Sequence, residues 1–229
     1  MRFAVYVAPP PDEPLAGLAA SWLGRDAWTG HAVERPAAVS PGPAVVARLT
    51  AEPRRYGFHG TMKPPFRLAA DLDAPRLRGT FADFCEGRAP VRIAALRLAR
   101  IGAFFALVPD GDAPALDALA ADVVRAFDAF RAPATAAETA RRRPERLSPR
   151  QRGYLETWGY PYVFEEFRFH MTLTGPVPEA EQGEVERVLQ AVFAPVIGKP
   201  LAVDALCLFV EPDPPGDFVV DMSAPLAGG

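Results

Sequence analysis

Hydrophobic and polar residues alternate along the segment 162–174, and this pattern predicts a β-strand with one apolar and one polar face. The apolar face carries Phe167, Phe169, Met171 and Leu173. The polar face carries Arg168, His170, Thr172 and Thr174. A polar stripe on so hydrophobic a strand is suited to the floor of a cleft.

A second segment, 57–63, repeats this pattern with FHGT in place of FHMT. Alternation places four residues on one face: Gly57, His59, Thr61 and Lys63. Pro64 and Pro65 are expected to end the strand, because proline has no backbone N–H to donate. Each of the two strands therefore offers an imidazole, a hydroxyl two residues further on, and a cation.

The remaining hydrophobic periodicity predicts several helices and strands. Helices are expected at 13–24, 75–86, 148–158 and 179–194, and over the apolar stripe from Leu116 to Phe130. Strands are expected at 3–7, 91–100, 102–108, 203–211 and 217–222, and a proline-bearing connection precedes Val45. The order motif strand, helix and hairpin occurs twice. The sequence thus predicts an α+β fold in which helices cover antiparallel sheets.

Composition places the chain among soluble globular proteins. With 49% hydrophobic residues and a net charge of −3, its 229 residues suit a single buried core and give no general affinity for nucleic acid. Cys85 and Cys207 belong to no paired motif and are expected to be buried thiols. Neither a signal peptide nor a membrane span is recognisable. We therefore expect a cytoplasmic protein with no membrane association, folded as one domain over 1–229.

The doubled motif provides the groups that phosphodiester cleavage requires. In-line attack needs a base on the attacking oxygen and an acid on the leaving oxygen. Two histidines with pKa values near about 6.5 can hold opposite protonation states at neutral pH. Hydroxyl and cationic donors can stabilise the phosphoryl oxygens. The chemistry requires no metal ion and no cofactor.

Simpler interpretations exist for each of these residues. A single histidine on a half-buried strand is more often structural, so it is the repetition that favours function. Lys63 and Arg168 could instead form surface ion pairs, and Tyr56 could be a packing residue. Zinc catalysis would need three protein ligands at a spacing that is absent here, and His31 is expected in a loop. The run Arg141–Arg152 could bind phosphates or be a solvated face.

The doubled His-x-Thr (HxT) motif resembles that of the two-histidine (2H) phosphoesterase superfamily. This superfamily contains the RNA 2′,3′-cyclic phosphodiesterases. Three longer stretches, WLGRDAWTG, YGFHGTMKPPFRL and WGYPYVFEEFRFHMTLTGP, resemble a branch that is encoded beside bacterial phosphonate-degradation genes.

The resemblance implies a bilobal fold in which two antiparallel sheets, with helices outside, face each other across a central cleft. One lobe would contribute the motif strand near 57–63 and the other the motif strand near 162–174. It also implies that His59 and His170 are the acid–base pair, with either order of roles, and that Thr61 and Thr172 bind the phosphoryl group. Strand geometry and proximity add three candidates for substrate binding: Lys63, Arg168 and Tyr56.

The sequence therefore predicts a metal-independent cyclic phosphodiesterase, a hydrolase that opens a small, ribose-based cyclic phosphate in phosphonate metabolism. Two alternatives stay open. One is a non-catalytic module that binds a nucleotide or a phosphorylated sugar in the same cleft. The other is an RNA 2′,3′-cyclic phosphodiesterase that uses Arg141–Arg152 to dock RNA. The expected partner is a small phosphorylated molecule, with RNA as the less favoured choice.

Overall fold

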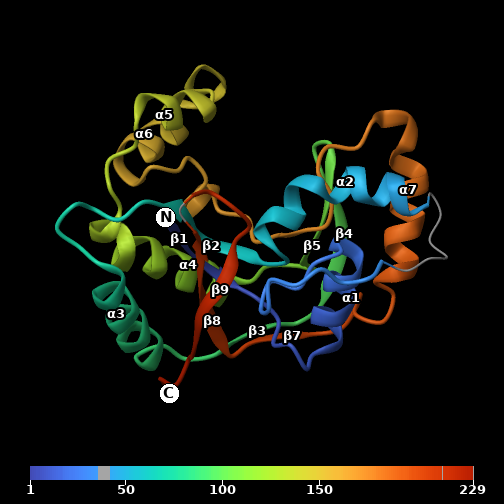
Figure 1. The fold of residues 1–229 in the computed structure, drawn as a ribbon, viewed down its shortest axis with the longest axis horizontal. Coiled ribbons are helices and arrows are strands. Elements are labelled where there is room, and N and C mark those ends of the chain that lie inside the picture. Colours follow the sequence, from blue (N-terminus) through green and yellow to red (C-terminus); the bar gives the residue numbers. More distant parts are fainter. Residues whose placement is uncertain (36–41, 213, 229) are drawn as a thin grey trace.

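The computed structural model describes residues 1–35, 42–212 and 214–228, which fold around one large antiparallel sheet (Figure 1). Its seven strands follow the order β4-β5-β6-β2-β1-β8-β9. They are β1 (Arg2–Val7), β2 (Gly60–Phe66), β4 (Leu96–Ile101), β5 (Phe104–Pro109), β6 (Met171–Thr172), β8 (Ala205–Glu211) and β9 (Val219–Pro225). A second, small sheet pairs β3 (Val91–Ile93) with β7 (Leu201–Val203).

The predicted α+β class is confirmed, and the two expected sheets take the form of two halves of the large one. One half consists of β2, β1, β8 and β9, and the other of β6, β5 and β4. The halves join where β2 pairs with β6, through Gly60 and Met171. Each half contributes one histidine motif to this junction.

Seven α-helices surround the strands in the described residues: α1 (Pro14–Leu23), α2 (Pro43–Tyr56), α3 (Ala74–Glu86), α4 (Pro114–Phe127), α5 (Ala136–Arg141), α6 (Pro149–Trp158) and α7 (Glu179–Val192). Helices α3 and α4 lie beside one half of the molecule, and α1, α2 and α7 beside the other (Figure 1). Among these helices, none combines the length and the apolar character that a membrane crossing requires.

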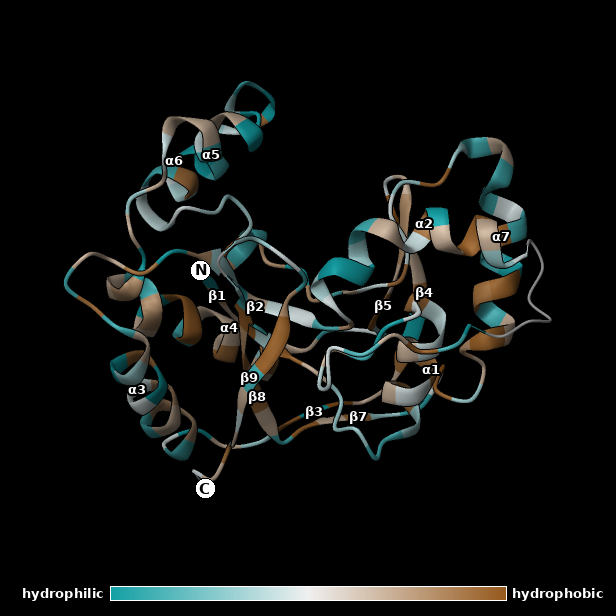
Figure 2. Ribbon diagram, viewed as in Figure 1, coloured by the Kyte–Doolittle hydropathy of each residue, from teal (hydrophilic) through white to brown (hydrophobic). Residues whose placement is uncertain are grey.

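Helices α5 and α6 form an arm (residues 135–160) that projects from the rest of the molecule (Figure 1). Ser148 caps α6 together with Gln151. Figure 2 shows hydrophilic residues over much of α5, whereas hydrophobic residues dominate β8. Val45 proves to lie in α2; part of the connection predicted before it, 36–41, lies outside the described residues.

Strand β1 lies between two apolar clusters. Phe3 and Val5 point into the main core, which also contains Phe81 of α3 and Phe127 of α4. Tyr6, on the opposite face, packs in a smaller cluster with residues of β8 and the loop before β9, namely Phe209 and Phe218. The first histidine motif joins this second face, because the His59 ring contacts Tyr6.

A β-bulge in β2 changes the faces that simple alternation predicts. Thr61 lies opposite Tyr6, and Lys63 lies opposite Val5. Between these two pairs β2 therefore contains one residue more than β1. Lys63 is thereby turned away from the face of Thr61. The prediction that Lys63 shares a face with the motif histidine is wrong for this reason.

Lys63 is buried against α4, with only 2% of the residue exposed. Its ammonium group donates hydrogen bonds to the Asp128 carboxylate at 3.2 Å and to the Val124 carbonyl at 3.4 Å. Burial lowers the pKa of Lys63 to about 8, although the neighbouring Asp128 opposes the shift. Lys63 thus ties β2 to α4.

A second bulge accommodates the two prolines. Pro64 and Pro65 do not end β2 as predicted, because the strand resumes at Phe66, which pairs with Phe3. The extra residue lies between Lys63 and Phe66 and leaves the proline pair outside the regular ladder. Both prolines then line the space beside the histidines.

The second motif segment is mostly irregular, so the strand predicted over 162–174 is wrong except at β6. Residues 164–166 form a 3₁₀ turn, with Phe164 at a positive φ of 53°. The Arg168 guanidinium donates hydrogen bonds to the carbonyls of Glu165 and Phe167. These two carbonyls therefore have donors without the pairing of a neighbouring strand. Alternation survives, since three predicted core residues, Phe169, Met171 and Leu173, are buried.

Replacing Asp128 by Asn tests the buried ion pair. We expect Asp128→Asn to lower the free energy of unfolding by about 3 kcal/mol, because the Lys63 ammonium stays buried without its carboxylate. Urea denaturation measures the effect. Asp122→Asn is the control: its carboxylate pairs at the surface with Arg88 and Arg125, and its loss should cost less than about 1 kcal/mol. Equal small losses in both variants would contradict the role given to Lys63.

Candidate active site

The two histidine motifs meet side by side at the junction of β2 and β6. The strands are antiparallel, and Gly60 is the direct partner of Met171. This register sets Thr61 beside His170 and Thr172 beside His59. Because residues on either side of a pair point to the opposite face from the pair itself, all four side chains share one face of the sheet. The motifs are thus related by an approximate twofold rotation.

His59 is fixed on three sides. Its Nδ1 lies 2.9 Å from the Gly57 carbonyl, its Nε2 lies 3.1 Å from the Thr61 hydroxyl, and its ring stacks on Tyr6 at 3.7 Å. A carbonyl can only accept, so Nδ1 carries the proton and the neutral ring presents Nε2 as an acceptor. Burial, and secondarily the charge of His170, lower the pKa of His59 to about 4.

His170 is held in the same way by its own motif. Its Nδ1 lies 2.7 Å from the Arg168 carbonyl, and its ring is 5.8 Å from that of Phe104. Each motif histidine therefore donates its Nδ1–H to the carbonyl two residues before it. Neither Nε2 atom takes part in this bond, and Nε2 of His59 accepts from the Thr61 hydroxyl.

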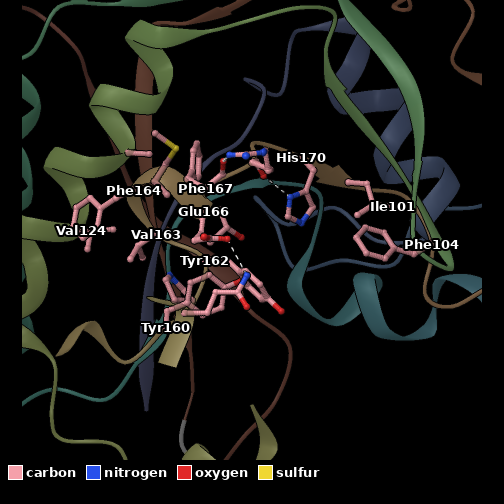
Figure 3. Close-up of a pocket in the computed structure, with 16 residues that line it drawn as sticks. Ile101, Phe104, Val124, Tyr160, Tyr162, Val163, Phe164, Glu166, Phe167 and His170 are labelled. Atoms are coloured by element: carbon pink, nitrogen blue, oxygen red, sulfur yellow. Dashed lines mark hydrogen bonds between the residues drawn. The ribbon is translucent and has the colours of Figure 1, made fainter. Parts of the chain in front are cut away.

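Two adjoining cavities open onto these rings. The smaller one, about 370 Å³, is lined by His59, Thr61 and Thr172. The larger one, about 520 Å³, is lined by Thr61 and His170. Figure 3 shows the larger cavity with His170 and Phe104 on one side and aromatic residues of the segment 160–167 on the other. The cavities share four wall residues, Thr61, Pro64, Phe104 and Tyr160, and together form one cleft.

The stretch WLGRDAWTG supports the first motif from behind. Arg25, buried at 1% exposure, donates to the carbonyls of Arg54 and Phe218 and so fixes the end of α2. Gly57 follows with a positive φ of 73°, and an added Cβ there would lie 2.4 Å from the Cβ of Ala27. Only glycine fits this turn, which supplies the carbonyl that holds His59.

The second motif has its own supports. The Trp22 indole N–H donates to the Leu173 carbonyl at 2.8 Å, and the Gly175 N–H donates to the Leu49 carbonyl at 2.7 Å. Thr174 is fully buried, and its hydroxyl accepts from the Phe105 N–H. Thr174 is therefore a structural residue, although alternation places it on the polar face.

The other predicted site residues differ in their positions. Tyr56 lines the smaller cavity, with its ring 6.4 Å from that of His59 and stacked on Phe218. Arg168 lines the larger cavity. Lys63 lies on the other side of the sheet.

Sequence reasoning missed two residues of the smaller cavity, Arg2 and Tyr6, and considered Arg142 only as part of the run Arg141–Arg152. Arg2 and Tyr6 alternate along the first predicted strand, but only the register with β2 reveals their closeness to the motif. Arg142 lies on the arm, whose position no local pattern encodes.

This arrangement is suited to acid–base chemistry on an oxyanion. Two imidazoles and two hydroxyls line one cleft, and cations lie at its edge. Among the described residues, no group of three or more His, Cys, Asp and Glu side chains is placed to hold a metal ion. The imidazoles are the groups in the cleft best suited to move protons near neutral pH.

Comparison with known families gives one match. Residues 61–219 match the model of a family described as protein of unknown function, DUF1045. The match includes Thr61 and the whole second motif and begins just after His59.

Two curated bacterial proteins are similar to the chain. Both are named ribose 1,5-bisphosphate phosphokinase PhnN. The protein of Janthinobacterium sp. (strain Marseille) is 36% identical over 231 residues, which cover 99% of this chain and 51% of that protein. The protein of Laribacter hongkongensis (strain HLHK9) is also 36% identical, over 93% of this chain and 49% of that protein. The chain thus spans about half the length of the curated relatives it matches.

Two solved structures align with the chain at low sequence identity. The protein TT0787 of Thermus thermophilus aligns over 100% of this chain and 99% of its own, with a TM-score of 0.50 and 16% identity. A structure described as a phosphoesterase aligns over 98% of both chains, with a TM-score of 0.44 and 12% identity. The alignment with TT0787 supports the α+β fold.

Enlarging Gly60 tests the junction. A Cβ at Gly60 would lie 2.3 Å from the Phe169 ring, which is itself buried in the core. We therefore expect Gly60→Ala to separate the motif strands and to lower the free energy of unfolding by about 1–3 kcal/mol. The matched control is Gly79→Ala in α3, where nothing lies within 4 Å, and which should be neutral or stabilising. Thermal unfolding compares them, and equal stability of the two variants would contradict the close contact.

Proposed function

We propose that this chain, which belongs to the DUF1045 family, is a metal-independent phosphodiesterase that hydrolyses a small cyclic phosphate. The observation that carries the proposal is the junction of β2 and β6, where two imidazoles and two hydroxyls share one face beside one cleft. We assign His59 and His170 as the acid–base pair and Thr61 and Thr172 as donors to the phosphoryl oxygens.

The state of His59 favours it as the base. Its pKa of about 4 keeps the ring neutral at pH 7, and Nε2 is its acceptor atom because Nδ1–H is bound to Gly57. In the proposed step Nε2 of His59 takes a proton from water as the water oxygen bonds to phosphorus. His170, in its protonated form, gives the Nε2 proton to the departing ring oxygen. The products are a phosphomonoester and a hydroxyl, and the two histidines exchange protonation states.

The electrostatic environment supports anion binding at this point. Arg2 and Arg142 line the same cavity as His59. Burial, followed by the charges of Tyr56 and Tyr160, raises the pKa of the Tyr6 hydroxyl well above its usual range, and the two arginines oppose this shift. Thr61 donates to Nε2 of His59 in the ligand-free site and can turn its hydroxyl to a phosphoryl oxygen once a substrate is bound. Preorganised donors of this kind stabilise the charge of a phosphoryl transition state.

The wider context supports a sugar phosphate as substrate. The curated relatives carry the name of a ribose 1,5-bisphosphate phosphokinase, and this chain corresponds to about half their length. The sequence has no Gly-x-x-x-x-Gly-Lys-Ser/Thr loop for nucleotide phosphates, so we assign it diester hydrolysis and not phosphoryl transfer from a nucleotide. The doubled motif supports membership of the 2H superfamily, and the resemblance to proteins encoded beside phosphonate genes supports a role in phosphonate metabolism in the cytoplasm.

Removing either imidazole tests the proposal. We expect His59→Ala and His170→Ala each to lower kcat for ring opening by about 10²–10⁴-fold, because each removes one proton-transfer partner. The assay follows a panel of ribose cyclic phosphates, with EDTA present, by ³¹P NMR. His31→Ala is the matched control, since this histidine is exposed in a loop and should leave kcat unchanged.

The panel also separates the alternatives. Tight binding of the wild type to every member without turnover would overturn the enzymatic proposal in favour of a binding module. Turnover of an RNA 2′,3′-cyclic end in strong preference to mononucleotides would favour an RNA enzyme. Loss of activity in EDTA, restored by a divalent cation, would contradict the metal-independent mechanism.

The pH profile tests the assignment of the base. A base must be neutral in the free enzyme, so kcat/KM should fall as the pH decreases through about 4, the pKa of His59. The rate should be independent of this group between about pH 5 and 6.5, where an ordinary histidine already loses activity by protonation. An acidic limb near 6.5 that disappears in His59→Gln would contradict a His59 that is neutral over this pH range.

A further inference from the structure

A third cavity, of about 230 Å³, adjoins the histidine site, and the charged residues in its wall are six arginines and Glu138. It shares four wall residues with the cavity of His59, namely Arg2, Tyr56, Pro65 and Arg142. Two of these four are cations. The space beside the imidazoles therefore continues into a basic pocket, most of whose arginines have no part in the proposed ring opening.

Six arginines line this basic pocket and come from separate parts of the chain: Arg2, Arg55, Arg67, Arg131, Arg141 and Arg142. Arg2 lies on β1, Arg55 ends α2, and Arg142 follows α5 on the arm. Cations gathered in this way from distant segments point to one shared anion, because like charges repel when nothing binds between them.

Carboxylates neutralise only part of this charge. Arg2 and Arg55 share Glu211, Arg67 pairs with Glu138, and Arg131 pairs with Asp128, which also binds Lys63. Three carboxylates thus serve four of the arginines and a lysine.

Arg141 and Arg142 have no carboxylate within ion-pair distance among the described residues. The Arg142 guanidinium instead lies 4.8 Å from the centroid of the Tyr160 ring, at the boundary with the histidine site. A planar guanidinium in this position can offer paired N–H groups to phosphate oxygens.

We infer that the basic pocket binds a second phosphate of the same substrate, so that the substrate is a cyclic phosphate that also carries a phosphomonoester. This inference rests on the proposed function. The cyclic ester would lie at the two imidazoles and the monoester among the arginines, with the sugar between Tyr56 and Pro65 in the shared wall. The monoester positions the ring for attack and distinguishes this substrate from an unphosphorylated one.

A small molecule fits the pocket better than a nucleic acid strand. The arginines line one cavity of about 230 Å³, whereas a strand requires cations spaced along a track. The neighbouring Arg143 and Arg146 are exposed and do not line the pocket. They continue the hydrophilic end of the arm (Figure 2) and provide matched controls for charge alone.

The test compares adenosine 2′,3′-cyclic phosphate with its 5′-phosphorylated form. We expect kcat/KM to be about 10- to 100-fold higher for the 5′-phosphorylated substrate, the worth of one or two charge-assisted contacts. Arg142→Gln should reduce this preference by at least about tenfold. Arg146→Gln, which removes the same charge from the same arm, should preserve it. Equal values for the two substrates in the wild type would overturn the inference.

A binding measurement separates this inference from the proposed reaction. Calorimetry with ribose 5-phosphate should show binding to the wild type and to His59→Ala, and binding weakened about tenfold or more in Arg142→Gln. That result would uphold the phosphate site even if no cyclic ester were hydrolysed. Absence of ribose 5-phosphate binding would overturn the site. Binding of single-stranded RNA that weakens equally in Arg142→Gln and Arg146→Gln would instead favour an extended RNA surface and contradict the inference.

Discussion

The antiparallel pair of Gly60 and Met171 decides where both histidines stand. It joins the two halves of the large sheet, and the register that it sets brings Thr61 beside His170 and Thr172 beside His59. The pair is close because Gly60 has no side chain where the Phe169 ring lies. FHGT and FHMT differ only at their third residue, and the glycine of the first motif has a physical reason. Gly60 leaves a space that the ring of Phe169, from the second motif, occupies. Any residue larger than glycine at position 60 would force the halves apart.

Three residues that do not line the cleft support this junction. Trp22 holds the end of β6, Arg25 holds the end of α2, and Lys63 ties β2 to the Asp128 carboxylate behind the sheet. Buried donors of this kind are costly unless they are paired, and pairing fixes them in one arrangement. The strands that carry the imidazoles are therefore held by buried, hydrogen-bonded residues, whereas the arginines of the arm reach the site from a projecting part of the molecule.

Prediction from sequence succeeded where local pattern determines structure. Alternation correctly separated Phe169 and Met171 from His170, and the doubled motif identified a pair of residues that the fold brings together. Prediction failed where strand register, or a contact between distant segments, determines the position of a residue. A bulge moves Lys63 to the other face, and a 3₁₀ turn replaces most of the strand predicted over 162–174. The arginines of the basic pocket converge only through tertiary structure, so no spacing in the sequence reveals them.

The central claim is that two imidazoles act on one phosphorus. A crystal structure with a ribonucleoside–vanadate complex, an analogue of the five-coordinate transition state, tests it most directly. The account predicts one vanadium centre whose oxygens lie within hydrogen-bond distance of Nε2 of His59 and of His170, with both motif threonines in contact. An anion that touches one histidine alone, or that binds outside the cleft, would contradict the account.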